Sequence, residues 1–172
     1  METGETKVET SVTHVAADEG GESLWVFGEL VTCKITSFRT GGAYSLFEVV
    51  TPLGGGPPPH VQHREDEAFY VLEGEYEFLI EGHNISAGAG SLVYVPKGKL
   101  HVHKNVDVRP GRMLVSQTPG GLHERFFEEV GEAAMGELRP PISDADAEVG
   151  SIAALAAGYG IEIPPMGRKR GG

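Results

Sequence analysis

The sequence predicts an all-β sandwich or barrel followed by two short helices. Between about residues 24 and 118, short runs rich in Val, Ile, Phe, Tyr and Thr alternate with turn residues, which is the spacing of sandwiches and barrels. In the run EYEFLI, the side chains of Tyr76, Phe78 and Ile80 share one face, as expected for a half-buried strand. No spacer before residue 119 is long enough for the crossover helix of a parallel sheet.

Each expected strand is a run of β-branched and aromatic residues bounded by turn residues. We expect the first run to form one N-terminal strand over about 24–37, and the break Glu73-Gly74-Glu75 to form a hairpin turn. In chain order the runs are LWVFGELVTCKITSF (24–38), AYSLFEVV (43–50), EAFYVLEG (67–74), EYEFLIEG (75–82), SLVYVP (91–96), HVHKNVDV (101–108) and MLVSQT (113–118).

The pattern becomes helical after residue 118. Leu122, Phe126 and Val130 lie at helical spacing, and Gly131 follows as a stop signal. A second helix is expected from Ser143, with Asp146 as its capping partner, through the Ala-rich run to Gly158 or Gly160, and IEI at 161–163 is expected to add an edge strand. The expected organisation is a flexible N-terminus (1–10), a barrel (11–118), a helical extension packed on the barrel (119–164) and a flexible tail (165–172).

Length and charge exclude several functions. The 172 residues are enough for one domain. Lys and Arg number 14 against 25 Asp and Glu, a formal net charge of −11, which argues against nucleic acid or an anionic membrane as the partner. The single Cys33 cannot form an intramolecular disulfide, and the first ten residues contain no apolar stretch. We therefore expect a cytoplasmic protein.

Histidines and acids gather in the segment PPPHVQHREDEAFYVLEG, which contains His60, His63 and Glu67. Side chains two residues apart on a strand share a face, so His60 and Gln62 point one way and His63 the other. The charged run Arg64-Glu65-Asp66 is expected to form a solvated turn.

The segment GSLVYVPKGKLHVHKN adds His101 and His103, which also share a face. If Glu67 enters the interior, it can converge there with His60 and His101. Two imidazoles and one carboxylate hold a divalent transition metal by one face and leave other positions open. The sequence therefore indicates a metal site of this kind. We expect His123, at the start of the first helix, to be an exposed first-turn residue, with a position in a lid as the alternative.

These residues resemble the two motifs of the cupin superfamily. The first motif matches at Gly54, His60, Gln62, Glu67 and Gly74, with Gln62 where the family has its second histidine. The second motif matches without a break at Gly90, Pro96, Gly98, His101 and Asn105. The resemblance implies a double-stranded β-helix, or jelly-roll, barrel with a metal in its mouth. The implied ligands are His60, Glu67 and His101, with Gln62 as a weaker oxygen donor.

The segments FGEL at 27–30 and GGLHERFFEEVG at 120–131 are similar to the quercetin-dioxygenase-like cupins. This narrower resemblance implies a helix beside the barrel entrance and an oxygenase that acts on a flavonol or another small phenolic or enolic compound with dioxygen. One divalent transition metal per chain is implied, and iron, manganese, nickel, cobalt, copper and zinc remain open. Glu67 is the candidate base. His103 is equally compatible with acid/base catalysis and with a satisfied core position.

Two other functions remain open. A redox-silent metal cupin could isomerise, cyclise or dehydrate a small molecule, with polyketide-cyclase-like cupins as the example, and the missing histidine slightly favours this class. A non-catalytic binding barrel is the third possibility. A homodimer is expected in each case, with the strand around 24–37 at its interface. Strand alternation gives as candidate pocket walls Phe47, Phe69, Tyr76, Phe78 and Met113, and Phe126 joins them from the first helix.

Overall fold

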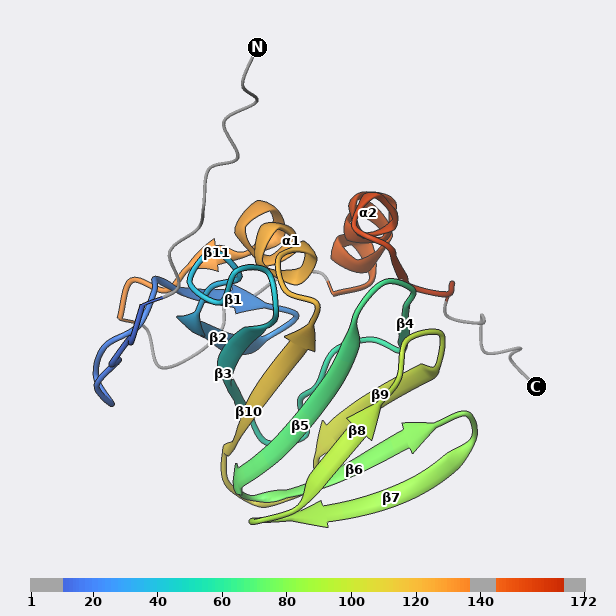
Figure 1. Cartoon of the computed structure of the whole chain (residues 1–172). Coiled ribbons are helices and arrows are strands. Elements are labelled where there is room, and N and C mark those ends of the chain that lie inside the picture. Colours follow the sequence, from blue (N-terminus) through green and yellow to red (C-terminus); the bar gives the residue numbers. More distant parts are fainter. Residues whose placement is uncertain (1–10, 137–144, 166–172) are drawn as a thin grey trace, which may run out of the picture.

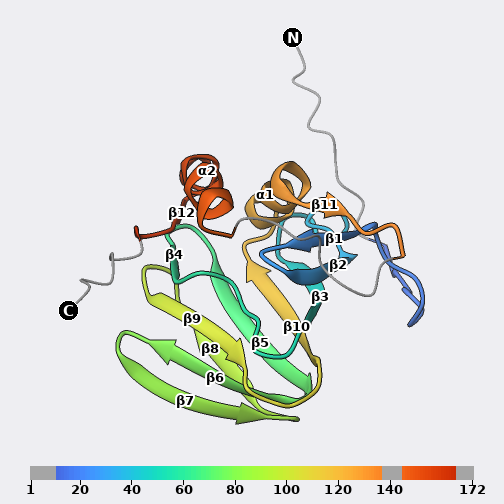
Figure 2. The ribbon, with the colours of Figure 1, turned by 180° about the vertical axis from the view of Figure 1, so that it is seen from behind.

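The computed structural model describes residues 11–136 and 145–165, which fold into two antiparallel sheets facing each other, with two helices side by side over one end (Figure 1). Figure 2 shows the same arrangement from behind, with both helices over the end of the barrel near β4 and β12. The predicted all-β jelly-roll barrel with two C-terminal helices is confirmed. Within the described ranges, neither helix is long and apolar enough to cross a membrane.

The strands divide into a larger and a smaller sheet. The larger contains β1 (Ser23–Val26), β2 (Glu29–Ile35), β3 (Ser45–Thr51), β5 (Asp66–Glu73), β8 (Leu92–Val95), β10 (Gly111–Thr118) and β11 (Glu132–Ala133), in the order β11-β1-β2-β3-β10-β5-β8. The smaller contains β4 (His60–Gln62), β6 (Glu75–Ile80), β7 (His83–Gly88), β9 (Leu100–Asn105) and β12 (Ile161–Glu162), in the order β12-β4-β9-β6-β7.

The core lies between the two sheets because alternate side chains of each strand point inward. On β5 the buried positions are Glu67, Phe69 and Val71. On β6 they are Tyr76 and Phe78, as the alternation predicted. Burying an aromatic or branched side chain of this size contributes about 1.5–3 kcal/mol. The same alternation that fills the core also carries polar residues inward at the open end of the barrel.

Two expected connections were wrong. The N-terminal run is not one strand, because Phe27 and Gly28 adopt φ values of 50° and 77° and turn the chain into a β1–β2 hairpin. The break at Gly74 is not a hairpin turn either. It joins β5 to β6, which lie in different sheets, and its φ of 92° suits glycine. β7 was not expected, because HNISAG has few strand-forming residues.

The helices follow the expected pattern. α1 spans Leu122–Val130 and ends at Gly131, as predicted. α2 spans Ala145–Gly158, so its predicted end is confirmed, while the expected cap at Ser143 lies outside the described residues. Ile161 and Glu162 form β12, which pairs with β4 at the edge of the smaller sheet as expected. The expected flexible N-terminus and almost all of the expected tail also lie outside the described residues.

Candidate metal centre

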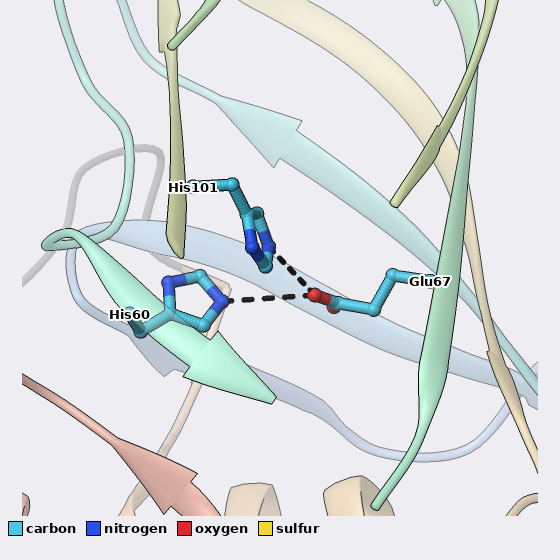
Figure 3. Close-up of side chains that lie close together, drawn as sticks. All are labelled: His60, Glu67 and His101. Carbon is cyan, nitrogen blue, oxygen red and sulfur yellow. Dashed lines mark ion pairs between the residues drawn. The ribbon is translucent and has the colours of Figure 1, made fainter. Parts of the chain in front are cut away.

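Three buried side chains from three strands meet at the open end of the barrel: His60 on β4, His101 on β9 and Glu67 on β5 (Figure 3). The β4–β9 pairing places His60 directly opposite His101, and Glu67 reaches them from the other sheet. One ligand atom from each residue lies within 4.8 Å of the other two. The convergence expected from strand alternation is therefore present.

The imidazoles are oriented by the backbone. Nδ1 of His60 lies 2.9 Å from the carbonyl of Pro58, and Nδ1 of His101 lies 3.0 Å from that of Lys99. A carbonyl only accepts, so each Nδ1 carries the proton and each Nε2 keeps its lone pair, the state required of a metal ligand. The Glu67 Oε2 atom lies 2.7 Å from His101 Nε2 and 3.7 Å from His60 Nε2.

The donor set fits a transition-metal ion. His101 Nε2 and Glu67 Oε2 are buried and lie 2.7 Å apart, and within the described residues neither has a hydrogen-bond partner besides the other. Leaving such a group unsatisfied costs about 1–3 kcal/mol, and a bound cation would satisfy both atoms. Two imidazole nitrogens and one carboxylate suit a divalent transition metal better than Mg²⁺ or Ca²⁺, which prefer oxygen ligands.

Burial and mutual interactions shift the pKa values of the three side chains. Burial lowers the pKa of His60, outweighing the nearby carboxylate of Glu67. Burial would raise the pKa of Glu67, but His101 and His60 outweigh it and hold the pKa well below its usual range. Burial opposes the charged form of His101 as well, yet Glu67 raises its pKa above the usual value. Glu67 is therefore ionised, as metal binding requires.

Gln117 fixes the Glu67 carboxylate. It lies opposite Glu67 in the β10–β5 pairing, and its Nε2 donates to Glu67 Oε1 at 2.8 Å. The second oxygen, Oε2, therefore faces the imidazoles. Sequence reasoning missed Gln117, although its position two residues beyond an inward-facing Val115 was the available signal.

The structure separates Gln62 from His63 as the alternation predicted. Gln62 is buried, and its Nε2 lies 2.8 Å from Nδ1 of His123, so its carbonyl oxygen is the end left for a metal. His63 is exposed on the other face and pairs with Glu162 at 2.8 Å. The role of Gln62 as a ligand stays a prediction.

A second polar pair lies deeper on β9. His103 points inward and is buried, and its Nε2 lies 2.9 Å from Oε1 of Glu29. Thr51 donates its hydroxyl to the same carboxylate oxygen at 2.6 Å. Nδ1 of His103 is buried without a hydrogen-bond partner within the described residues. Glu29 was missed as a site residue, because it follows a hairpin turn whose position the sequence did not indicate.

Two expectations about surface residues were wrong. Glu65 is 1% exposed rather than part of a solvated turn, because Oε1 accepts from the backbone N–H groups of Leu122 (3.0 Å) and His123 (3.4 Å). This caps α1, whose N-cap residue Gly121 has no side chain to do so. His123 is 5% exposed rather than solvated, since this capping contact docks the first turn of α1 onto the barrel.

A largely apolar cavity reaches several of these groups, since His60, Glu67, His103 and His123 line it, whereas His101 does not. It holds about 630 Å³ of empty space including its open mouth, which suits a small molecule. Of the predicted walls, Phe47, Phe69 and Phe126 line it. The other three, Tyr76, Phe78 and Met113, are fully buried in the core and do not line it.

Comparisons with known proteins agree with the jelly-roll fold. Residues 47–116 match the family model described as "Cupin domain". The chain is 25% identical over 130 residues to quercetin 2,3-dioxygenase of Bacillus subtilis (strain 168), covering 76% of this chain and 38% of that protein. It is 32% identical over 130 residues to germin-like protein subfamily 2 member 1 of Arabidopsis thaliana, covering 69% of this chain and 56% of that protein. The chain thus spans less than two thirds of each of these two relatives.

Solved structures share the fold at low sequence identity. KdgF from Halomonas sp. has a TM-score of 0.58 at 16% identity, covering 64% of this chain and 96% of that one. The polyketide cyclase RemF from Streptomyces resistomycificus has a TM-score of 0.57 at 19% identity, covering 82% and 94%.

Proposed function

We propose, from the premise that this chain is a small protein of the cupin superfamily, that it is a metal-dependent oxygenase. Its substrate would be a flavonol or another small phenolic or enolic compound, with dioxygen as the second substrate. The observation that carries the proposal is the buried cluster of His60, Glu67 and His101, in which His101 Nε2 and Glu67 Oε2 face each other at 2.7 Å and His60 and Glu67 line an apolar cavity.

The three clustered side chains would hold one divalent transition metal. Such an ion, when bound, supplies a Lewis acid for the substrate oxygen and, if redox-active, a site for dioxygen. Glu67 would also take the phenolic or enolic proton at Oε2, which requires this oxygen to loosen from the metal while Gln117 keeps hold of Oε1. His60 and His101 stay fixed by their Nδ1 hydrogen bonds.

His103 is the second candidate for proton movement. Its Nε2–H donates to Glu29, which leaves Nδ1 as the basic nitrogen, and the residue lines the cavity. Glu29 would stabilise the imidazolium formed when Nδ1 takes a proton. Its carboxylate is itself held by Thr51, so the ring has one orientation.

The cavity wall selects the rest of the substrate. Aromatic side chains from the larger sheet and from α1 line it, among them Phe47, Phe69 and Phe127. Phe47 and Phe127 meet edge to face with ring centroids 5.2 Å apart. Such a wall binds a flat, ring-bearing molecule and excludes water from it.

The test is an oxygen-electrode and absorbance assay of the protein loaded with the metal it retains on purification, with quercetin and catechol as probes. Oxygen uptake coupled to loss of the probe, abolished by chelation and restored by the same metal, is the expected result. His63→Ala is the matched control, because His63 lies outside the cavity. No oxygen uptake on any flavonol, catechol or enol with the metal in place would contradict the oxygenase.

The second candidate is a redox-silent isomerase, cyclase or dehydratase. The buried His103–Glu29 pair favours it, because a proton can be moved there without an oxidant. The replacement of a histidine ligand by Gln62 favours it too, since an amide oxygen makes the site less nitrogen-rich. Conversion of a probe compound at the same rate under argon as in air would support this class over the oxygenase.

A further inference from the structure

Three polar residues meet at the end of the cavity that α1 covers, and we refer to Gln62, Glu65 and His123 as the helix-end cluster. All three are buried. Nδ1 of His123 lies 2.8 Å from Nε2 of Gln62 and 3.3 Å from Oε2 of Glu65. Buried polar groups are costly unless they are paired, and here two of the three serve to hold the third.

His123 is the member of the cluster that reaches the cavity. It lines the cavity, whereas Gln62 and Glu65 do not. Nδ1 makes two contacts, to Gln62 Nε2 at 2.8 Å and to Glu65 Oε2 at 3.3 Å, whereas Nε2 has a single approach, at 3.3 Å, from the same amide nitrogen. Nε2 is therefore the nitrogen open to a ligand. Among the described residues that line the cavity, His123 is the polar side chain contributed by a helix.

The ring is held rigidly. Phe127 packs against it with centroids 4.6 Å apart, and Phe126 at 5.9 Å. The first turn of α1 is fixed by Glu65 on one side, and Glu124 on the other side bonds the hydroxyls of Ser37 and Ser45. A group this well anchored, yet facing a cavity, is preorganised for binding rather than needed for packing alone.

We propose that Nε2 of His123 binds a second oxygen of the substrate, distinct from the oxygens that face the metal centre. The inference rests on the proposed function and adds a specificity determinant to it. His123 lines the same cavity as His60 and Glu67 but comes from α1 rather than from a strand. The favoured substrates are then ring-bearing phenols or enols that carry a further hydroxyl besides the oxygens that face the metal. A hydroxyl suits either tautomer of His123, because it both donates and accepts.

The test compares two catechols of nearly equal shape, 3,4-dihydroxybenzyl alcohol and 4-ethylcatechol, which differ by a hydroxyl in place of a methyl. Their dissociation constants are measured by calorimetry under argon, on protein loaded with the metal it retains. For each variant the readout is the dissociation constant of 4-ethylcatechol divided by that of the alcohol. This ratio should be about tenfold larger for the wild type than for His123→Phe. His63→Ala should keep the wild-type ratio, with metal content measured for every variant.

His123→Gln is the second variant, because it keeps a polar side chain beside Glu65, and it should retain part of the preference. Glu65→Gln should lower the preference without changing metal content, as a positioning residue would. An equal ratio for the wild type and His123→Phe would overturn this inference alone. Binding of neither catechol by the wild type would overturn it together with the proposed phenolic substrate class.

Discussion

Polar residues are buried on two sides of the cavity, the strand side and the helix side, for different physical reasons. On the strand side, His60, Glu67 and His101 point inward because alternate residues of a strand face the core. On the helix side, Glu65 and His123 are buried because α1 docks onto the turn before β5. Burial on a strand is a local property of the sequence, whereas burial at a helix end depends on which element packs against it.

The largest expected effect is the loss of metal binding when a ligand on the strand side is removed. His101→Ala removes one imidazole from the cluster and should abolish metal retention, measured as metal per chain after purification without a chelating column. His63→Ala, on the outer face of the barrel, should retain the wild-type amount. Equal metal content in the two variants would show that alternation does not select the ligands.

The next effect tests how tightly the strand side is packed. A Cβ added at Gly56 would lie 2.1 Å from the carbonyl oxygen of His103, at a backbone φ of 152°. Gly56→Ala should therefore lower the free energy of unfolding by about 2–4 kcal/mol, measured by urea denaturation.

The matched change on the helix side is Gly150→Ala in α2. A Cβ there meets nothing within 4 Å, so better helix propensity should raise the free energy of unfolding by up to about 1 kcal/mol. A loss of stability at Gly150, or none at Gly56, would contradict the packing described for the two sides.

An effect somewhat smaller than that of Gly56→Ala concerns the cap of α1. Glu65→Ala leaves two backbone N–H groups of the first turn without their acceptor, so the free energy of unfolding should fall by about 1–3 kcal/mol. Glu77→Ala, an exposed carboxylate on β6, should change it by less than about 0.5 kcal/mol. If the two variants unfold at the same urea concentration, Glu65 is not what docks α1.

The smallest effect concerns the thiol of Cys33 on β2 and changes neither the metal content nor the fold. Burial, and then the charges of Glu124 and Glu128, raise the pKa of Cys33 to about 11. Because the thiolate is the reactive form, alkylation by iodoacetamide should be slow at pH 8 and should keep rising with pH toward 11. Glu128→Gln should speed the reaction at pH 8. A rate that levels off near pH 8.5 would contradict the raised pKa.

The fold and the strand side of the site could be predicted because both follow from short-range patterns. Alternation placed His60, Glu67, His101 and His103 inward and His63 outward. The spacing of Gly54 to Gly74 and of Gly90 to Asn105 then carried the resemblance to the cupin motifs.

The helix side could not be predicted, for a physical reason. The sequence shows a charged run at Arg64-Glu65-Asp66 and a histidine in a first helical turn, and both patterns are typical of solvated residues. Their burial arises only when α1 meets the β4–β5 turn in three dimensions. The metal's identity, the ligand role of Gln62 and the expected homodimer stay predictions.

The most direct test of the metal centre is a crystal structure of the protein with its retained metal, with anomalous data collected at that metal's absorption edge. We predict one anomalous peak per chain at bonding distance, about 2.0–2.3 Å, from Nε2 of His60, Nε2 of His101 and Oε2 of Glu67. A peak bound elsewhere, or no peak from protein saturated with Fe²⁺, Mn²⁺, Co²⁺, Ni²⁺, Cu²⁺ or Zn²⁺, would contradict the account.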